Sequence, residues 1–445
     1  MGLGFKKFVE YMTTREISPC KIINVILYSI VLVMPFIVTR NYYSPYLGAK
    51  LLFMYIAGTI LLFAAVLTKN EMMKMYKEKI IVLCYFASLV FTTIFSIDID
   101  TAIIGKQDRG EGLIILGIYF LSFLMSAKYL KITKKMIKAV LIVSCIMGIY
   151  CILQFYGFDI FLSILNKKII SFGSIALIGN KNFASTYILI FLSLSVPLYI
   201  FKGEKIYYVC SLILFGALLC TTTRGCWIAF AIMCVVGLSF VIKRKELWIR
   251  TGIVIFSLGI VFTMLNQTSN GKLSSRFRSI GQEISQVDEK GVGSLGTNRV
   301  AIWIITMKSI EKHPFMGAGL DSLQYRINRD EFEEHRIFIK KYNEIIDKAH
   351  NEFIELWACG GIVSLICYIV LIVVILKELI RAMKKHNDDK YKIMFLFFIT
   401  YLMQSFVNIS MVACASIYWI MLGAIVQQYR LAKEEEPDNV NAMSL

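Results

Sequence analysis

Basic residues stand at the beginning of several apolar runs of this chain. Arg224, Lys181 and Arg109 each lie just before, or at the start of, such a run. If the runs are helices, each cation sits at the positive end of a helix dipole, which costs a few tenths to about 1 kcal/mol. A bound anion would reverse that cost, as phosphate does at helix N-termini. The pattern therefore predicts an anion-binding site built from helix starts.

His350 and Asn351 precede a fourth apolar run, and Arg299 lies in the first turn of a further predicted helix. The positive helix end disfavours a charged imidazole, so His350 is expected to be neutral and able to act as a general base. Guanidinium groups bind phosphate oxygens in a bidentate manner, which suits Arg224 and Arg299 to an anionic group. For any single cation the alternative is a side chain that extends to the lipid headgroups.

A metal ion is the alternative source of positive charge. Asp98 and Asp100 lie at the end of an apolar run and could hold a divalent cation, although such a pair more often only ends a helix. The eleven Cys contain no Cys-x-x-Cys pair, which favours a role in helix packing. We therefore expect no metal and no cofactor.

The composition places these residues in a membrane protein. Of 445 residues 57% are hydrophobic and 18% are charged, and the mean hydropathy is +0.65. The apolar runs are roughly 17 to 25 residues long, the length of a membrane-spanning helix. The sequence thus predicts an all-α, polytopic integral membrane protein with about twelve transmembrane helices. The expected spans are 22–38, 49–67, 80–97, 112–128, 137–156, 183–201, 206–222, 225–242, 248–265, 353–376, 392–410 and 413–429.

The distribution of Lys and Arg predicts the orientation. Connections on the side of the N-terminus carry about 27 of these residues and the opposite connections about 8, when the long polar loop is set aside. Both termini are therefore expected in the cytoplasm, in a multi-pass protein of the inner or cytoplasmic membrane. The net charge of +17 is spread over connections, so no nucleic-acid partner is expected. The lipid bilayer is the expected surrounding.

The domain organisation follows from one long polar interval. Residues 1–265 carry predicted helices 1–9, 266–350 form one large extracytoplasmic loop between helices 9 and 10, 351–430 carry helices 10–12, and 431–445 form a cytoplasmic tail. Within the loop, 266–297 is rich in Gly, Ser, Asn and Gln and is expected to be irregular. A short interfacial helix is expected from Thr297-Asn298 to His313-Pro314, and a charged one over about 330–347.

Several motifs resemble the O-antigen ligase and polymerase superfamily. They are Thr223-Arg224-Gly225, Arg299 through Trp303 followed by Pro314 and Gly317-x-Gly319, and His350-Asn351 followed by nine residues and Gly361. The segments Gly105 to Gly112 and Asn180-Lys181-Asn182 are similar to the family as well. Ser364 stands where the ligases usually carry Gly, Thr or Tyr.

The resemblance implies a helical bundle with a large extracytoplasmic loop. It also implies a glycosyltransferase that moves a glycan from undecaprenyl pyrophosphate to an acceptor hydroxyl, for cell-surface polysaccharide assembly. By motif, His350 is the expected catalytic residue, and Arg224 and Arg299 bind the pyrophosphate. Lys181, Arg109 and Asn351 are expected substrate contacts. The acceptor could be a glycan, a lipid or a protein.

Two other functions remain open from the sequence. A polysaccharide polymerase of the same superfamily would differ only in its acceptor. A lipid-linked glycan transporter or flippase would also have about twelve helices and a basic outer vestibule, but it should carry charges within its spans. The predicted spans here are nearly free of charge.

Overall fold

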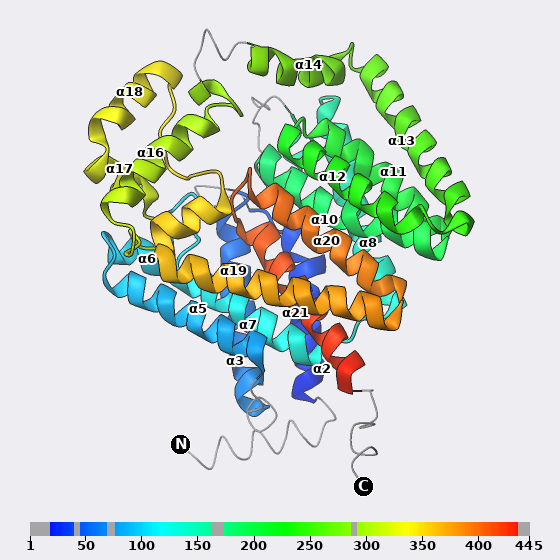
Figure 1. The fold of residues 1–445 in the computed structure, drawn as a ribbon, viewed down its shortest axis with the longest axis horizontal. Helices are drawn as coiled ribbons and strands as arrows, with labels where there is room; N and C mark the ends of the chain where they lie inside the picture. Colours follow the sequence, from blue (N-terminus) through cyan, green and yellow to red (C-terminus); the bar gives the residue numbers. More distant parts are fainter. Residues whose placement is uncertain (1–17, 40–44, 69–75, 162–172, 286–291, 435–445) are drawn as a thin grey trace.

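The computed structural model describes residues 18–39, 45–68, 76–161, 173–285 and 292–434, and these residues form helices without strands (Figure 1). Each of the twelve predicted spans overlaps one α-helix. Most bounds agree closely, but the span predicted to end at 376 continues as a helix to His386, and the one predicted to end at 38 is α-helical only to Leu32. These helices are α2 (Pro19–Leu32), α3 (Gly48–Leu67), α5 (Lys77–Ile94), α7 (Leu113–Tyr129), α8 (Lys134–Phe155), α10 (Lys181–Lys202), α11 (Lys205–Cys220), α12 (Arg224–Val241), α13 (Trp248–Thr268), α19 (Glu352–His386), α20 (Asp389–Ser405) and α21 (Val412–Glu434).

Eight of the described helical segments are long and apolar enough to cross a membrane. Two more, α7 and α11, are apolar but shorter, while α5 and α20 carry charges at their ends. The chain is therefore a multi-pass membrane protein, and the count of twelve spans stays a prediction.

The centre of the bundle is formed by α10 and α21, whose side chains are almost all buried. α21 packs against α7, and α10 packs against α11 and α20. By contrast α13 lies at the periphery and leaves most of its apolar side chains exposed. Apolar side chains that point outward from a peripheral helix indicate contact with lipid. The interior helices are packed on all sides, and they can therefore hold a site rigidly.

The prediction of an irregular segment over 266–297 is wrong for most of its length. α13 continues to Thr268, and Lys272–Ser285 form a further helix, α14, at the top of Figure 1. Phe277 of α14 stacks on Trp227 of α12 with ring centroids 4.6 Å apart. Polar residues dominate the segment, but Leu273 is fully buried and Phe277 packs on Trp227, and these contacts hold the segment in a helix.

The rest of the long loop folds into a small helical unit of its own. Its helices are α16 (Arg299–Lys312), α17 (Leu323–Asp330) and α18 (Phe332–Tyr342), shown in yellow in Figure 1. Thus the short helix expected after Asn298 is confirmed. The charged helix expected over about 330–347 is α18, which ends earlier, at Tyr342, and α17 before it was not predicted. Ile305, Leu323 and Phe338 form a second hydrophobic core against Ala358 of α19.

Two motif glycines join this unit to α19. Gly361 has φ +79° and interrupts the helical conformation of α19. A Cβ on Gly317 would lie 2.1 Å from the carbonyl oxygen of Cys359, and one on Gly361 would lie 2.7 Å from that of Phe315. Only glycine permits this approach of two backbones, so the start of α19 and the loop unit are fixed relative to each other.

Candidate active site

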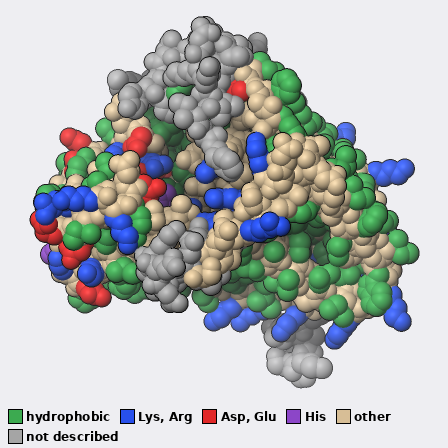
Figure 2. Space-filling view, turned by 90° about the horizontal axis from the view of Figure 1, so that it is seen from above, with side chains coloured by type: hydrophobic (Ala, Val, Ile, Leu, Met, Phe, Trp, Pro, Cys, Tyr) green, Lys and Arg blue, Asp and Glu red, His purple; other side chains and the backbone are tan. Residues whose placement is uncertain are grey.

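A cavity of about 720 Å³ lies where the loop unit meets the starts of α10, α12 and α16. Four of the predicted site residues line it: Lys181, Arg224, Arg299 and His350. They are far apart in sequence and come together because three helices begin here and His350, two residues before α19, lies beside their starts. Figure 2 shows Lys and Arg side chains gathered in a hollow of this face.

One side of the cavity is strongly basic. We call Lys181, Arg224, Arg276 and Arg299 the basic wall. Arg224 donates hydrogen bonds to Thr297 Oγ1 (2.9 Å) and Ser279 Oγ (3.3 Å), and Arg276 Nε donates to the carbonyl of Thr222 (3.2 Å). No carboxylate among the described residues forms an ion pair with Arg299. Burial and the nearby Arg224 lower its pKa. Four cations held this close favour a multiply charged anion.

The helix starts add to the positive potential. Lys181, Arg224 and Arg299 are the first residues of α10, α12 and α16. The N-cap residues of α12 and α16, Thr223 and Asn298, make no capping hydrogen bond through their side chains. First-turn N–H groups that no cap satisfies are donors for an anion at the helix N-terminus.

His350 lies in the cavity lining with a left-handed backbone, φ +50°. Its Nδ1 is buried and has no hydrogen-bond partner among the described residues. Burial, followed by repulsion from Arg299, lowers the pKa of His350 to about 4, although the Asp347 carboxylate acts in the opposite direction. The imidazole is therefore neutral at physiological pH, the state that a general base requires.

Asn351 and Arg109 do not line the cavity, and each supports a residue that does. Asn351 is buried and caps α19, accepting hydrogen bonds from the N–H groups of Phe353 (2.9 Å) and Ile354 (3.1 Å). Arg109 donates from Nε to Asp347 (3.0 Å), a residue of the lining. The structure thus places both predicted substrate contacts behind the cavity surface, where they position His350 and Asp347.

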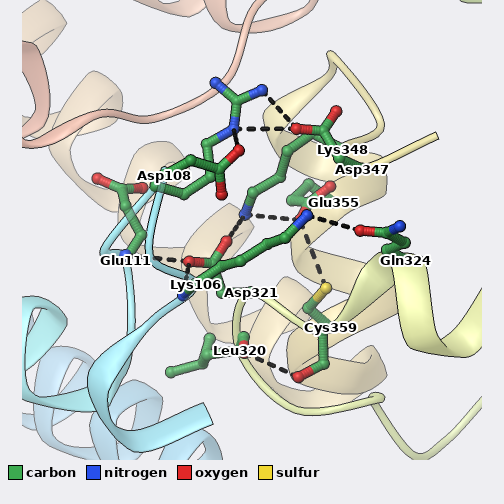
Figure 3. Close-up of polar contacts among 12 residues, drawn as sticks. Lys106, Asp108, Glu111, Leu320, Asp321, Gln324, Asp347, Lys348, Glu355 and Cys359 are labelled. Carbon is green, nitrogen blue, oxygen red and sulfur yellow. Dashed lines mark hydrogen bonds and ion pairs between the residues drawn. The ribbon is translucent and has the colours of Figure 1, made fainter. Parts of the chain in front are cut away.

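A buried ion-pair network, absent from the sequence prediction, holds the segment that leads to His350 (Figure 3). Lys348 Nζ lies 2.5 Å from Asp321 and 3.0 Å from Glu355. Asp321 also accepts from the backbone N–H groups of Lys106 (2.7 Å) and Glu111 (3.2 Å). Three segments distant in sequence, 106–111, the turn at Asp321 and 348–355, are therefore joined two residues before the imidazole.

The backbone immediately before His350 is held from two further sides. The Glu355 carboxylate accepts a hydrogen bond from the N–H of Ala349 (2.8 Å), and Trp303 Nε1 donates one to the carbonyl of Ala349 (2.8 Å). A buried charge network of this kind costs free energy to form, but it allows few alternative arrangements of the chain. It thereby orients the imidazole.

Asp98 has a structural role in the described part of the chain. Its side chain caps the short helix α6 (Ile99–Ile104) by accepting from the N–H of Thr101 at 3.0 Å. Asp100 lies in the first turn of the same helix, where a carboxylate interacts favourably with the dipole. Both carboxylates thus interact with the start of α6, Asp98 as its cap and Asp100 within its first turn.

Comparison with known proteins agrees with the geometry. Residues 209–369 match the family described as O-antigen ligase, and this range contains Arg224, Arg299 and His350. The match supports placing the chain in the O-antigen ligase superfamily of membrane proteins, as its motifs predict, and this family suggests a glycan-transferring enzyme. No curated protein matches the chain.

Proposed function

We propose that the protein is a membrane glycosyltransferase that moves a glycan from undecaprenyl pyrophosphate to an acceptor hydroxyl on the extracytoplasmic face of the cytoplasmic membrane. The observation that carries the proposal is the cavity itself. It combines the basic wall, three helix starts and a neutral His350 within about 720 Å³. Such a site has both the charge for a pyrophosphate and the base for a hydroxyl.

The basic wall would stabilise the leaving group. Cleavage of the bond between sugar C1 and pyrophosphate leaves negative charge on the departing oxygen, and fixed cations stabilise this charge as it develops. Arg224 and Arg299 supply guanidinium groups for bidentate contacts, while Lys181 and Arg276 add charge from α10 and α14. The cations are positioned before the substrate arrives, so little reorganisation is needed during the reaction.

His350 would remove the proton of the attacking hydroxyl. The acceptor oxygen bonds to C1, the bond from C1 to the pyrophosphate oxygen breaks, and the electron pair leaves with the lipid pyrophosphate. The proton on His350 passes to solvent before the next turnover. Nδ1 is buried and has no partner among the described residues, so Nε2 is the ring nitrogen that would take the proton. The bonds to Ala349 hold the backbone next to the ring while it does so.

The proposal is tested with purified protein in liposomes that contain an undecaprenyl pyrophosphate-linked glycan and candidate acceptors. The wild type should release free lipid pyrophosphate in an acceptor-dependent manner, and His350→Ala should release little. Equal release by wild type and His350→Ala would contradict the mechanism. Growth of the donor glycan itself, when no other acceptor is present, would identify the polymerase of the same superfamily.

A further inference from the structure

The turn that joins α16 to α17 carries an aromatic side chain that the protein leaves largely uncovered. Phe315 is 77% exposed, more than any other large hydrophobic side chain that the structure describes, and Met316 beside it is exposed as well. The carbonyl of Ala318 accepts a hydrogen bond from the N–H of Ile97 (2.9 Å), and the N–H of Ala318 donates one to the carbonyl of Ala358 (2.9 Å). The exposed ring is therefore carried on a turn whose backbone is fixed to the segment after α5 and to α19.

The two helices beside this turn each present a stripe of exposed apolar side chains. α5 and α19 pack against each other along the bundle (Figure 1). The exposed residues recur at helical spacing and are Ile80, Leu83, Phe91 and Ile94 on α5, and Val363, Ile366, Val370 and Val373 on α19. On the helices of a membrane protein such stripes indicate contact with lipid.

Both stripes end at the turn. Ile94 is the last residue of α5, and Phe95 and Ile97, which follow it, are exposed too. Val363 comes just after the kink at Gly361, where an added Cβ would lie 2.7 Å from the carbonyl oxygen of Phe315. A single exposed apolar side chain on a loop needs no explanation, but this one continues two lipid-facing surfaces. Aromatic rings are enriched where such surfaces reach the membrane–water interface.

We propose that the turn with Phe315 and Met316 inserts into the lipid bilayer, in the leaflet on the side of the loop unit, and docks that unit on the membrane surface. Lipid is the partner because the apolar surface of the turn is continuous with the lipid-facing stripes. Lys312 and His313 directly before the turn are about half exposed, at 51% and 50%, which suits them to the level of the headgroups. An apolar tip next to polar or charged residues is the arrangement of an interfacial segment.

Docking of the turn also restrains the cavity. α16 begins at Arg299 in the cavity lining and ends at Lys312 before the turn, so the helix is held at both ends. A lipid pyrophosphate presents its charge at the level of the headgroups, and the anchored helix would keep the basic wall at that level. This consequence rests on the proposed function, whereas the docking itself does not.

The test measures the surroundings of a nitroxide attached to Phe315→Cys or Met316→Cys in the full-length protein, without donor, in nanodiscs of phosphatidylcholine and phosphatidylglycerol. Electron paramagnetic resonance gives the access of oxygen, which concentrates in lipid, and of a nickel chelate, which stays in water. Val363→Cys is the lipid reference and Arg336→Cys on α18, 55% exposed, the water reference. All variants carry Cys84→Ala, because Cys84 is exposed. The ratio of oxygen to nickel access at the turn should match that at the lipid reference and exceed that at the water reference several-fold.

Met316→Cys is the decisive variant because it keeps the Phe315 ring. Nickel access there equal to that at the water reference would place the turn in water and overturn the docking. Low access to both reagents would mean that protein, such as a second copy of the chain, covers the turn, and this would overturn it too. No donor is present, so neither result bears on glycan transfer. Equal release of lipid pyrophosphate by wild type and His350→Ala would, conversely, leave the docking intact.

Discussion

His350 is held in a conformation that few residues other than glycine adopt. A left-handed φ costs an L-residue on the order of 1–3 kcal/mol when the surrounding structure enforces it. Here the enforcement is visible: Trp303 and Glu355 bind the preceding peptide group, and Asn351 caps the helix that follows. Such strain next to a buried, unpaired Nδ1 agrees with a residue selected for its position in the cavity rather than for stability.

The protonation state of His350 leads to a prediction about pH. A base works only when it is deprotonated, and the pKa of His350 is lowered to about 4 in the free protein by burial and by Arg299. The kcat/KM for the acceptor should therefore stay level as the pH falls from 8 to about 5 and should decline only near pH 4. A decline centred near the ordinary histidine pKa of about 6.5 would contradict this. In Arg299→Gln, which removes the repelling charge, the decline should move to higher pH.

Arg299 should contribute more to anion binding than an arginine of the loop surface. It lines the cavity without an ion pair to any described carboxylate, so its charge is not already neutralised. The loss of a charge-assisted hydrogen bond costs about 1.5–3 kcal/mol, so Arg299→Ala should weaken binding of inorganic pyrophosphate roughly tenfold to hundredfold. Titration calorimetry in detergent at low salt measures this.

Two further variants control for charge and for shape. Arg329→Ala removes an arginine that is paired with Asp330 outside the lining, and it should bind pyrophosphate as the wild type does. Arg299→Lys keeps the charge but loses the planar fork, so it should fall between the two. Equal affinity for Arg299→Ala and Arg329→Ala would exclude Arg299 from the anion site.

At the scale of elements, the kink in α19 connects the site to the bundle. Gly361→Ala places a Cβ against the carbonyl of Phe315 in a backbone with φ +79°. The variant should lose about 1–3 kcal/mol of stability, measured by thermal unfolding in detergent. Gly259→Ala in α13, where nothing lies within 4 Å of the added Cβ, should be neutral or stabilise by up to about 1 kcal/mol. Equal melting temperatures for the two variants would mean that the approach of Gly361 to the loop unit is not rigid.

α14 and Arg276 show which part of an element escapes sequence reasoning. The segment has apolar residues at Leu273, Phe277, Ile280 and Ile284, a helical spacing that indicates an amphipathic helix. Its many Ser and Gly residues hide this spacing when composition alone is considered. The contact of Arg276 with Thr222 is tertiary, and no local pattern specifies which cation of a polar segment reaches the site.

At the scale of the whole molecule, the sequence predicts best those features that depend on a single run of residues or on the place of one residue along it. The apolar runs locate the helices because spanning segments must be long and uncharged, and Lys181, Arg224, Arg299 and His350 are visible because they stand at helix starts. Arg109 and Asn351 were predicted by the same pattern, but neither lines the cavity: Arg109 lies in the connection between α6 and α7, and Asn351 caps α19. The network of Lys348, Asp321 and Glu355 joins positions far apart in the chain, and only the folded arrangement brings these charges together.

The orientation of the whole molecule in the membrane is a prediction that labelling can decide. Lys and Arg are retained on the cytoplasmic side, so the connection after α19 should face the cytoplasm and the loop unit should face outward. Of the eleven native cysteines only Cys84, within α5, is exposed, and it lies in a helix that the lipid should shield. The unmodified protein thus provides a low background.

In intact cells an impermeant maleimide should label Arg336→Cys on α18, where the side chain is 55% exposed. Arg381→Cys on α19, 69% exposed, should be labelled only after the membrane is permeabilised. The opposite result would place the cavity on the cytoplasmic side. An outward-facing glycan transfer would then be impossible, however well the basic wall binds pyrophosphate.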